Sequence, residues 1–374
     1  MKILNVNSQL DPVIGGGTAE RTLQISLALK NEGVDCKILT TDIGFENGSL
    51  PRLEGLNVTA YQCLLKRFYI PRVSFASIKK EVEGVDVIHI MGHWSVLNAL
   101  VYLVARRLKK PYVVCPAGAL PIYGRSKTLK AIYNWVIGRR IIHDASAWVA
   151  ITEDECAHFD AYGIDRKHVV VIPNGINPDD FSEADVQGFR KKHGLGNHPF
   201  ILFLGRLNSI KGPDLLLEAF CRGQEKWTEW HLVFAGPDGG LLDSLKKSAV
   251  GSRVHFVGYV GGEEKSSAYH SAQLLVIPSR QEAMSIVVLE AGISGVPVLL
   301  TDQCGFDAVG RNGGGAVTPA TVEGLQNGLE SLLNGKTSLE LMGGKLKDYV
   351  KENYTWRIVI RKYMDLYAGL LHRE

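Results

Sequence analysis

The sequence of 374 residues is 45% hydrophobic, so it can bury a large core, and its length alone favours two domains. Its formal net charge of +3 does not require a nucleic-acid partner, and we expect none. The first half of the chain is mildly the more basic, which permits an anionic partner or contact with a membrane surface.

The sequence shows no evident membrane anchor. No apolar run approaches the ~18 to 20 residues of a membrane span, and the N-terminus has the composition of a strand, not of a signal peptide. The six cysteines are scattered without a C-x-x-C pair, which indicates reduced thiols. We therefore expect a cytoplasmic protein and leave open a place at the inner face of the membrane.

The first strand is expected at Lys2–Asn7, followed by a glycine-rich turn and a helix, which is how a doubly wound α/β unit opens. The turn lacks the last glycine of a G-x-G-x-x-G fingerprint, because Glu20 stands there, and it lacks the Lys-Ser/Thr of a P-loop. It is either a plain tight turn or a turn that faces phosphate. We favour the second because Gly15, Gly16 and Gly17 would let a ligand approach the backbone.

Further strands are expected at 36–40, 85–90, 112–115, 147–151 and 169–172, separated by helical or irregular stretches. This alternating order predicts a parallel sheet covered on both faces. His93 and Gly118 lie in loops that follow two of these strands, at the end where such sheets bind ligands. A lone loop histidine is nevertheless more often structural or exposed than functional.

Between Pro121 and His143 basic side chains alternate with aromatic and aliphatic ones, and no acidic residue occurs before Asp144. We favour a helix with one solvated basic face over a core. The alternative is an amphipathic surface for lipid headgroups or for a lipid-linked acceptor.

Residues 172–181 are rich in turn formers and are the expected boundary between the domains. A second alternating series opens with a strand at Phe200–Leu204 and a turn that carries Arg206 and Lys211. Two cations beside a helix N-terminus are suited to a diphosphate, whereas the alternative is two solvated loop charges. Gly236 opens the loop after the next strand.

The most informative pattern surrounds 277–302: a strand at Leu274–Ile277, a loop with Glu282, an almost wholly apolar helix over 286–293, and another strand over 296–300. Glu290 is the acid in that helix, and burying it unpaired would be costly. It pairs either with a nearby arginine or with ligand hydroxyls. We favour hydroxyls, because eight residues along a helix would separate Glu282 from Glu290 by ~12 Å, too far for one metal ion but suited to an elongated polyhydroxylated ligand. Between them, backbone N–H groups would face an anion at Ala283, Met284, Ser285 and Ile286.

The Glu282-x7-Glu290 spacing resembles the E-x7-E signature of retaining GT-B glycosyltransferases, most closely the family 4 enzymes that use nucleotide-sugar donors. The first-loop pattern GG-x-x-E-R at 16–21, the linker P-N-G at 173–175 and G-R-L with K-G-x-D-x-L-L-x-A-F at 205–220 resemble the same family. The resemblance covers the whole chain.

The resemblance implies an α/β protein of two Rossmann-like doubly wound parallel-sheet domains that face each other across a cleft. Residues 1–173, completed by the C-terminal helix 355–374, would be the acceptor side. Residues 174–354 would bind the nucleotide sugar, with Gly236 and the 283–286 segment beside the donor.

Individual roles follow from the same resemblance. Arg206 and Lys211 would hold the leaving diphosphate, Glu282 would lie beside the donor sugar, and Glu290 would bind the ribose. His93 and Gly118 would lie on the acceptor side. Many relatives have His-Gly and a charged residue where this chain has Met91 and Ala117, so the role of His93 is left open.

The predicted function is transfer of a sugar, with retention of configuration, from a nucleotide-diphosphate sugar to a hydroxyl of a sugar or lipid-linked acceptor. Polysaccharide, lipopolysaccharide or glycolipid assembly is the expected setting, with peripheral membrane contact left open. We expect no metal and no other cofactor, because the cations and the helix N-terminus can stabilise the diphosphate.

Two alternatives remain. A sugar-nucleotide epimerase or hydrolase of the same fold would share the donor contacts, and a nucleotide-sugar-binding protein would lack turnover. An NAD-dependent oxidoreductase is disfavoured because neither half carries the dinucleotide fingerprint.

Overall fold

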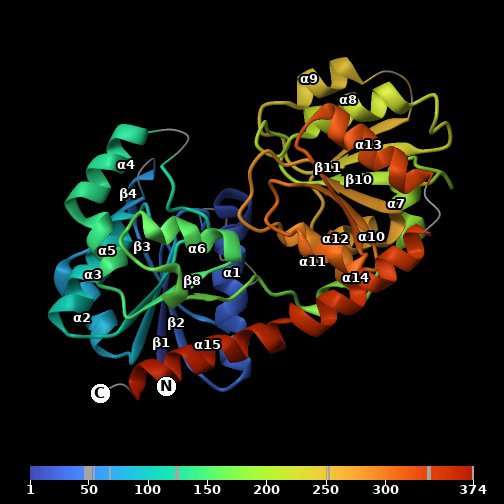
Figure 1. Ribbon diagram of the computed structural model, residues 1–374. Helices are drawn as coiled ribbons and strands as arrows, with labels where there is room; N and C mark the ends of the chain where they lie inside the picture. Colours follow the sequence, from blue (N-terminus) through green and yellow to red (C-terminus); the bar gives the residue numbers. More distant parts are fainter. Residues whose placement is uncertain are drawn as a thin grey trace. The chain divides into compact units, whose positions relative to one another are not determined.

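The computed structural model describes residues 1–45, 53, 55–66, 69–122, 126–249, 251, 253–334 and 338–372, without the side chains of 12–14. The chain divides into two compact units (Figure 1). One consists of Met1–Gly175 with Trp356–Glu374, and the other of Ile176–Thr355. Each unit is built on its own parallel sheet.

The first unit contains a seven-stranded parallel sheet in the order β3-β2-β1-β6-β7-β8-β9. Its strands are β1 Lys2–Val6, β2 Asp35–Thr41, β3 Asn57–Tyr61, β6 Val87–Met91, β7 Tyr112–Cys115, β8 Ala147–Ala150 and β9 Val169–Val171. A separate antiparallel pair consists of β4 Cys63–Leu65 and β5 Ile70–Pro71. The sequence pattern did not predict β3, β4 or β5, because these strands are mostly half-exposed and mixed in polarity.

Helices lie on both faces of this sheet (Figure 1). They are α1 Pro12–Asn31, α2 Phe75–Glu83, α3 Val96–Arg107, α4 Lys127–Tyr133, the π-helical η3 Asn134–Gly138, α5 Arg139–His143, α6 Glu153–Asp160, the short 3-10 turn η4 Arg166–His168, and α15 Trp356–Leu371. β6 and β7 are buried along their whole length, as expected of strands covered on both faces. A single core cluster therefore joins them to α3 and α5, with Ile88, Val101, Val114 and Ile141 among its members.

The glycine-rich segment is not the turn that we expected before the first helix. α1 already begins at Pro12, so the three glycines lie inside its span. Gly16 has φ 61° and ψ −145°, which interrupts the helix and leaves two helical pieces across a kink. Only glycine adopts such a conformation readily, so the residue is used to bend the helix.

The second unit contains a six-stranded parallel sheet in the order β12-β11-β10-β13-β14-β15. Its strands are β10 Phe200–Leu204, β11 His231–Ala235, β12 Val254–Gly258, β13 Leu274–Ile277, β14 Val298–Thr301 and β15 Gly315–Thr318. The remaining elements are η5 Pro178–Phe181, α7 Val186–Lys192, α8 Pro213–Gly223, α9 Leu242–Ser248, α10 Glu263–Ser271, α11 Ile286–Ile293, α12 Ala308–Asn312, α13 Val322–Leu333 and α14 Leu339–Asn353.

The predicted buried helix is α11, and it has the predicted bounds. It packs against α14 so closely that a Cβ on Gly292 would come within 2.6 Å of the Val350 side chain. An apolar helix is expected in such a place, because it is covered by a sheet on one side and by another helix on the other.

Both sheets reverse their strand order beside the first strand of the unit. In the first unit this occurs between β1 and β6, and in the second between β10 and β13. Loops that leave neighbouring strands in opposite directions at such a point leave room for a ligand at the carboxyl ends of the strands. The predicted α/β fold with two Rossmann-like domains is confirmed.

Candidate active site

An ion pair lies at the strand-order reversal of the second sheet. Lys211 Nζ, from the loop after β10, is 2.6 Å from Glu282 Oε1, from the loop after β13. Ser279 Oγ donates a hydrogen bond to the other carboxylate oxygen at 3.0 Å. The Glu282 N–H donates to the carbonyl of Gln303, beyond β14, at 2.9 Å. Two residues predicted to act on the donor are thus brought together by three neighbouring loops.

The pair remains within reach of solvent. The Lys211 side chain is 32% exposed and that of Glu282 is 15% exposed. An anionic ligand can therefore reach Lys211 and compete with Glu282 for it. Replacement of Glu282 by the ligand is favourable when the ligand carries more negative charge than one carboxylate, because the Lys211 ammonium is then attracted more strongly.

Gly212 holds the loop after β10 against the loop after β13. It is the N-cap of α8 with φ 66°, and a Cβ there would come within 2.1 Å of the Pro278 carbonyl oxygen. The neighbouring Lys211 N–H donates to Asn208 Oδ1 at 3.0 Å. The direction in which Lys211 leaves the backbone is therefore fixed by packing on one side and by a hydrogen bond on the other.

Arg206 is exposed in the same loop, next to the backbone bridge that joins Leu207 to Asp238. Gly236 explains how the two loops approach each other. Its φ is 146°, and a Cβ there would lie 1.9 Å from the carbonyl oxygen of Gly205. Gly236 therefore has a packing reason to be glycine, and its predicted contact with the donor stays a prediction.

The N-terminus of α11 carries a buried hydroxyl. Ser285 is the N-cap and is fully buried, yet its Oγ has no hydrogen-bond partner among the described residues. Leaving such a group unsatisfied costs about 1–3 kcal/mol. Met284 is buried, whereas Ala283 and Ile286 are partly exposed. The first N–H groups of any helix also lack partners inside the helix, so this end is suited to an anionic or hydroxylated ligand.

Glu290 is paired inside the protein. Lys265 Nζ lies 2.7 Å from Oε1, and Tyr269 OH donates to Oε2 at 2.7 Å. Burial raises the pKa of Tyr269 well above its usual range, and the Glu290 carboxylate raises it further, so the phenol keeps the proton that it donates. The internal ion pair that we disfavoured is present, with lysine in place of the expected arginine. Each carboxylate oxygen can accept another hydrogen bond, so the ribose contact stays a prediction.

The helical distance argument for the two acids does not hold. α11 begins only at Ile286, so Glu282 lies in a loop and the rise of 1.5 Å per residue does not apply to the segment before the helix. Glu282 is placed by Lys211 and Ser279. The position of Glu290 instead follows from α11.

The other predicted site residues lie in the first unit. His93 follows β6, is only 3% exposed, and has Nε2 2.8 Å from Asn134 Oδ1. Trp94, Tyr133 and Tyr162 pack around its ring at centroid distances of 4.5, 5.7 and 5.5 Å. Burial lowers the pKa of His93 to about 4, against the hydrogen bond with Asn134, so the imidazole is neutral at physiological pH. The surroundings of His93 favour the structural interpretation.

Gly118 is held by an acid that the sequence analysis missed. Its N–H donates to one oxygen of Glu155, and the Ile151 N–H donates to the other at 2.7 Å. Glu155 is 2% exposed, and this burial raises its pKa against the two N–H bonds. Gly118 has φ 81° and Ala117 φ 51°, so the loop is bent at two successive residues. The only sequence signal was an acid in the first turn of a helix capped by Thr152.

Gly15, Gly16 and Gly17 also belong to the first unit. The Gly15 N–H donates to the Asp11 carbonyl at 2.7 Å, and a Cβ there would come within 2.8 Å of the Ala19 Cβ. A Cβ on Gly16 would meet nothing within 4 Å. Gly15 is thus restricted by packing and Gly16 by its backbone angles, and the predicted phosphate contact stays a prediction.

Comparison with known proteins accounts for both units. Residues 16–175 match the family described as glycosyl transferase 4-like domain, and residues 185–353 match glycosyl transferases group 1. The chain belongs to the family 4-type glycosyltransferases. The resemblance inferred from the sequence motifs is confirmed, and the protein is a glycosyltransferase of the GT-B type.

Relatives differ in how much of the chain they share. This glycosyltransferase is 26% identical to the uncharacterized glycosyltransferase MJ1607 of Methanocaldococcus jannaschii over 98% of both chains. It is 32% identical to a D-inositol 3-phosphate glycosyltransferase of Geodermatophilus obscurus, but over only 50% of this chain and 45% of that protein. The chain thus spans about half the length of that second relative.

Two solved structures show the same fold. Alr3699/HepE of Anabaena, in complex with UDP and glucose, has a TM-score of 0.80 at 16% identity, covering 99% of this chain and 100% of that one. WaaG, a glycosyltransferase involved in lipopolysaccharide biosynthesis, has a TM-score of 0.70 at 19% identity, covering 98% and 100%. At these identities the likeness concerns the fold alone.

The described residues offer neither a metal-binding cluster nor a membrane-spanning helix. No group of three or more His, Cys, Asp or Glu side chains in this part of the chain is placed to hold a metal ion. Within the same residues, no helix combines the length and the apolar character that crossing a bilayer requires.

Proposed function

We propose that this glycosyltransferase moves a sugar, with retention of anomeric configuration, from a nucleotide-diphosphate sugar to an acceptor hydroxyl. The observation that carries the proposal is the Lys211–Glu282 pair, which lies at the strand-order reversal of the second sheet and is partly exposed. A lysine that is held in place but still reachable is a suitable partner for a diphosphate that arrives with the donor.

The chemistry requires stabilisation of a growing negative charge. When the bond between the sugar and the diphosphate breaks, the anomeric carbon becomes oxocarbenium-like and charge builds on the phosphate. Lys211, Arg206 and the N-terminal end of α11 would stabilise that charge, and such fixed charges and dipoles are usually the largest contribution to catalysis. The leaving phosphate would then accept the proton of the acceptor hydroxyl, so no divalent metal ion would be required.

The ion pair would also change partners during the reaction. Before the donor binds, Glu282 holds Lys211 in position; once the diphosphate is bound, Lys211 would contact phosphate. Glu282 would then accept hydrogen bonds from the hydroxyls of the donor sugar, while Ser285 and the α11 N–H groups meet the phosphate. Glu290 would add a ribose contact through its remaining lone pairs.

The acceptor side is proposed to be the first unit, with the loops of His93 and Gly118. We propose a sugar or lipid-linked acceptor in the assembly of a polysaccharide, lipopolysaccharide or glycolipid, at the cytoplasmic face of a membrane. The relative from Geodermatophilus obscurus is named for D-inositol 3-phosphate, a hydroxylated compound, which is consistent with transfer to a hydroxyl.

The test is a thermal-shift screen with UDP-, GDP- and ADP-sugars, followed by transfer assays with the donor that binds. A ligand that binds the native state raises the melting temperature, and NMR of the product gives the anomer. A binding donor that is only hydrolysed or epimerised would favour those two activities instead. Donor binding without any turnover would favour a binding protein. The buried, neutral His93, whose surroundings favour a structural role, is consistent with that interpretation.

A further inference from the structure

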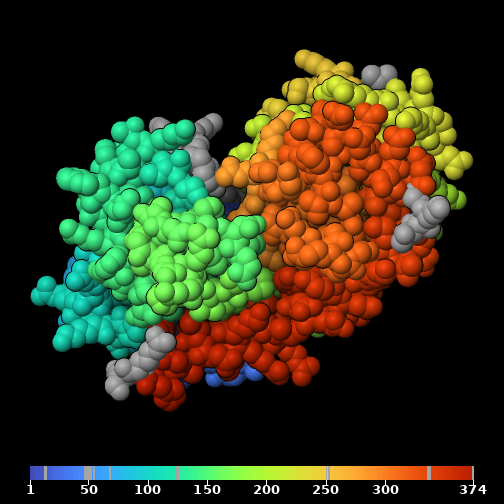
Figure 2. Space-filling model, in the orientation of Figure 1, coloured from blue at the N-terminus to red at the C-terminus, as the bar shows by residue number. Residues whose placement is uncertain are grey.

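An uncovered apolar face runs along residues 127–143 of the first unit. α4, η3 and α5 form one continuous helical segment there, here called the outer helix. Leu129 and Ile132 are each 50% exposed, Val136 is 53% exposed, and Trp135 is 83% exposed. Single exposed apolar residues are ordinary on protein surfaces, but a group of them that includes a highly exposed tryptophan indicates an interaction surface. Figure 2 shows this blue-green segment on the outside of its unit.

The spacing places these side chains on one face. Leu129, Ile132 and Val136 are three and four residues apart, which is the spacing of a helical stripe. The π-helical turn then adds a residue to the winding, so Trp135 and Val136 both face outward while Asn134 is buried. The helix over a core with solvated basic residues that we favoured from the sequence is present, but exposed apolar side chains share its outward surface.

The charged side chains of the outer helix are all basic. Lys127, Arg139 and Arg140 are exposed on the outer helix, and the sequence has no acid between 127 and 143. Residues 123–125, which include Arg125, lie outside the described residues. Apolar and aromatic side chains bordered by basic ones are typical of helices that lie in the interface of an anionic bilayer.

The inner side of the outer helix is tied to the acceptor-side loops. Tyr133 OH donates to the Ser95 carbonyl at 2.9 Å, and Asn134 contacts both His93 and Tyr162 at 2.8 Å. A Cβ on Gly138 would come within 2.4 Å of Asn134 Oδ1. The exposed face and the His93 loop thus lie on opposite sides of the same short helix.

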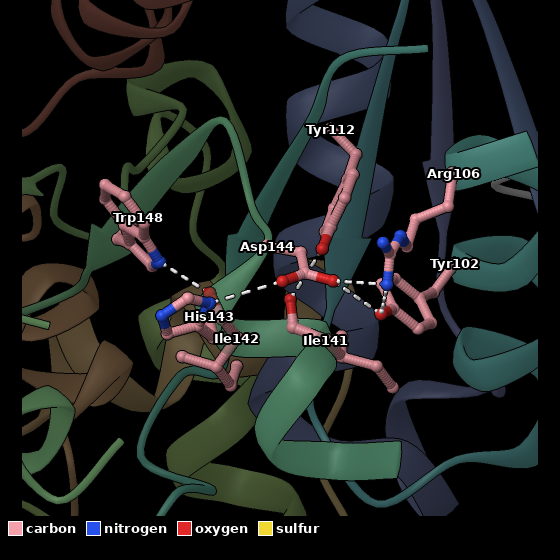
Figure 3. Close-up of polar contacts among 8 residues, drawn as sticks. All are labelled: Tyr102, Arg106, Tyr112, Ile141, Ile142, His143, Asp144 and Trp148. Carbon is pink, nitrogen blue, oxygen red and sulfur yellow. Dashed lines mark hydrogen bonds and ion pairs between the residues drawn. The ribbon is translucent and has the colours of Figure 1, made fainter. Parts of the chain in front are cut away.

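The far end of the outer helix is anchored as well. Tyr112 OH donates to the Ile141 carbonyl at 2.9 Å and Trp148 Nε1 donates to the Ile142 carbonyl at 2.7 Å (Figure 3). Asp144, the next residue after α5, accepts a hydrogen bond from Tyr102 at 2.7 Å. Side-chain donors therefore satisfy carbonyls at the helix end that the helix itself leaves open. The apolar face is exposed on a firmly held element.

We propose that the outer helix is a docking surface for a membrane that contains anionic lipids. The inference rests on the proposed function in one respect: the outer helix belongs to the unit proposed to bind the acceptor, so a bilayer at this face would bring a lipid-linked acceptor to that unit. A second copy of the chain fits less well, because a two-fold contact through this face would bring Arg139 and Arg140 close to their own copies. The basic face instead complements lipid headgroups.

The experiment is co-sedimentation of the full chain with vesicles of phosphatidylglycerol and phosphatidylcholine, and with vesicles of phosphatidylcholine alone. We expect binding to the anionic vesicles that weakens as salt rises, because exposed charges are screened beyond ~10 Å at 0.1 M. Changing Arg139 and Arg140 together to Ser should weaken binding by roughly 20- to 30-fold at low salt, at about fivefold for each charge. Trp135→Ser should weaken binding to the same vesicles at all salt concentrations.

Matched controls lie in the second unit. Leu341→Ser removes a side chain that is 56% exposed, and Lys246→Ser with Lys247→Ser removes an adjacent exposed basic pair from α9. Binding that falls in the outer-helix variants and not in these controls supports the proposal. Unchanged binding by the outer-helix variants overturns the proposal. A dimer in light scattering that Trp135→Ser dissociates, together with no binding of the unmodified chain to vesicles, overturns it as well.

The outcome can be separated from that of the proposed function. Donor affinity, measured by calorimetry without lipid, should be the same in the unmodified chain and in Trp135→Ser. If no nucleotide sugar binds the unmodified chain, the proposed function fails, while vesicle binding and its loss in Trp135→Ser still decide the docking surface.

Discussion

At the residue scale, the pairing of side chains decides which of the predicted roles is open to each. Lys211 is held by a partly exposed acid, so it can change partner. Glu290 is held by Lys265 and Tyr269 and is 9% exposed, so it needs no ligand for its charge to be balanced. The two glutamates of the same motif therefore differ in how strongly the structure favours contact with a ligand.

Replacing Lys211 with Ala should lower kcat by ~10²–10³ if the lysine acts like a removed oxyanion donor. The donor dissociation constant should rise by less, because the diphosphate gains charge only as the sugar leaves. Arg206→Ala should behave likewise. The experiment measures donor affinity by calorimetry and turnover with an acceptor to which the unmodified protein transfers sugar.

The control for this pair of variants is Lys226→Ala, which removes an exposed lysine paired with Glu330 away from the site loops. It should change neither quantity. Equal losses of binding and turnover in the site variants would mean that the cations bind the donor uniformly and give no preference to the transition state.

Glu290→Gln separates ligand contact from structural pairing. The amide keeps the shape and can still accept from Tyr269, but the ammonium of Lys265 loses its counter-charge, so the free energy of unfolding should fall by about 1–3 kcal/mol. If Glu290 also binds ribose, affinity for the nucleotide diphosphate should fall as well. Urea unfolding and calorimetry measure the two effects.

Lys265→Met is the matching variant, because it removes the pairing and keeps the acid. It should lower stability while most of the nucleotide affinity remains. If Glu290→Gln lowers stability and leaves affinity unchanged, the ribose assignment is wrong and Glu290 is a structural acid.

At the scale of elements, glycines set how closely loops and helices approach each other around the site. Gly212 lies against Pro278, Gly236 against Gly205, and Gly305 against Ala283, and none of these contacts leaves room for a Cβ on the glycine. These contacts join the loops after β10, β11, β13 and β14. The site loops therefore depend on backbone packing as much as on the side chains that they carry.

Gly212→Ala should both destabilise the second unit and disturb the site. Its φ of 66° costs any L-residue about 1–2 kcal/mol, and the new Cβ would also push against the Pro278 carbonyl. Lys211 should move with this loop, so turnover should fall further than stability alone explains. Urea unfolding and donor turnover of the purified variant measure the two effects.

Gly194→Ala is the control, since Gly194 has φ 64° but a Cβ there would meet nothing within 4 Å. It should show the backbone strain without the loss of turnover. A Gly212→Ala variant that keeps full turnover would show that Lys211 does not depend on this contact.

At the scale of the whole chain, the C-terminal helix belongs to the first unit. α15 returns there after the second unit is complete, and Tyr363 OH lies 2.6 Å from Arg21 NH2. The same guanidinium donates to the Ile172 carbonyl at 2.7 Å and to Asn174. One buried arginine therefore joins α1, α15 and the segment that leads into the second unit.

Transfer by the intact chain should persist in excess chelator. The reason is that the proposed charges on the diphosphate are met by Lys211, Arg206 and the α11 N-terminus. The assay compares initial rates with and without EDTA, and then after Mg²⁺ or Mn²⁺ is added back. Complete loss of activity that either ion restores would contradict the account based on protein cations.

The local sequence was sufficient wherever burial was uniform along an element. β10, β13 and α11 were predicted with their bounds, because an element covered on both sides is apolar at nearly every position. Two edge strands, β3 and β15, escaped prediction, whereas the edge strand β9 was predicted from its run of valines. β15, with the sequence Gly-Ala-Val-Thr, and β3 are too short and too mixed to stand out from loops.

The tertiary structure decided which side chains pair with each other. Lys211 and Glu282 are 71 residues apart, Lys265 and Glu290 are 25 apart, and Glu155 reaches Gly118 across 37 residues. Motif spacing marked Glu282 and Glu290 as important but could not show that one is held by a loop and the other by a neighbouring helix. Only the strand order brings those loops together, and strand order depends on long-range packing that no local window of sequence contains.

The outer helix shows the same division within a single segment. The sequence from Pro121 to His143 showed that basic and apolar side chains alternate, and it left open whether the outward face is a solvated basic one or an amphipathic surface for lipid. The π-helical turn, the buried Asn134 and the anchors at Ile141 and Ile142 fix which side faces the core. Composition therefore determined that the helix is amphipathic, and packing against the β6 loop determined that its uncovered face carries Trp135.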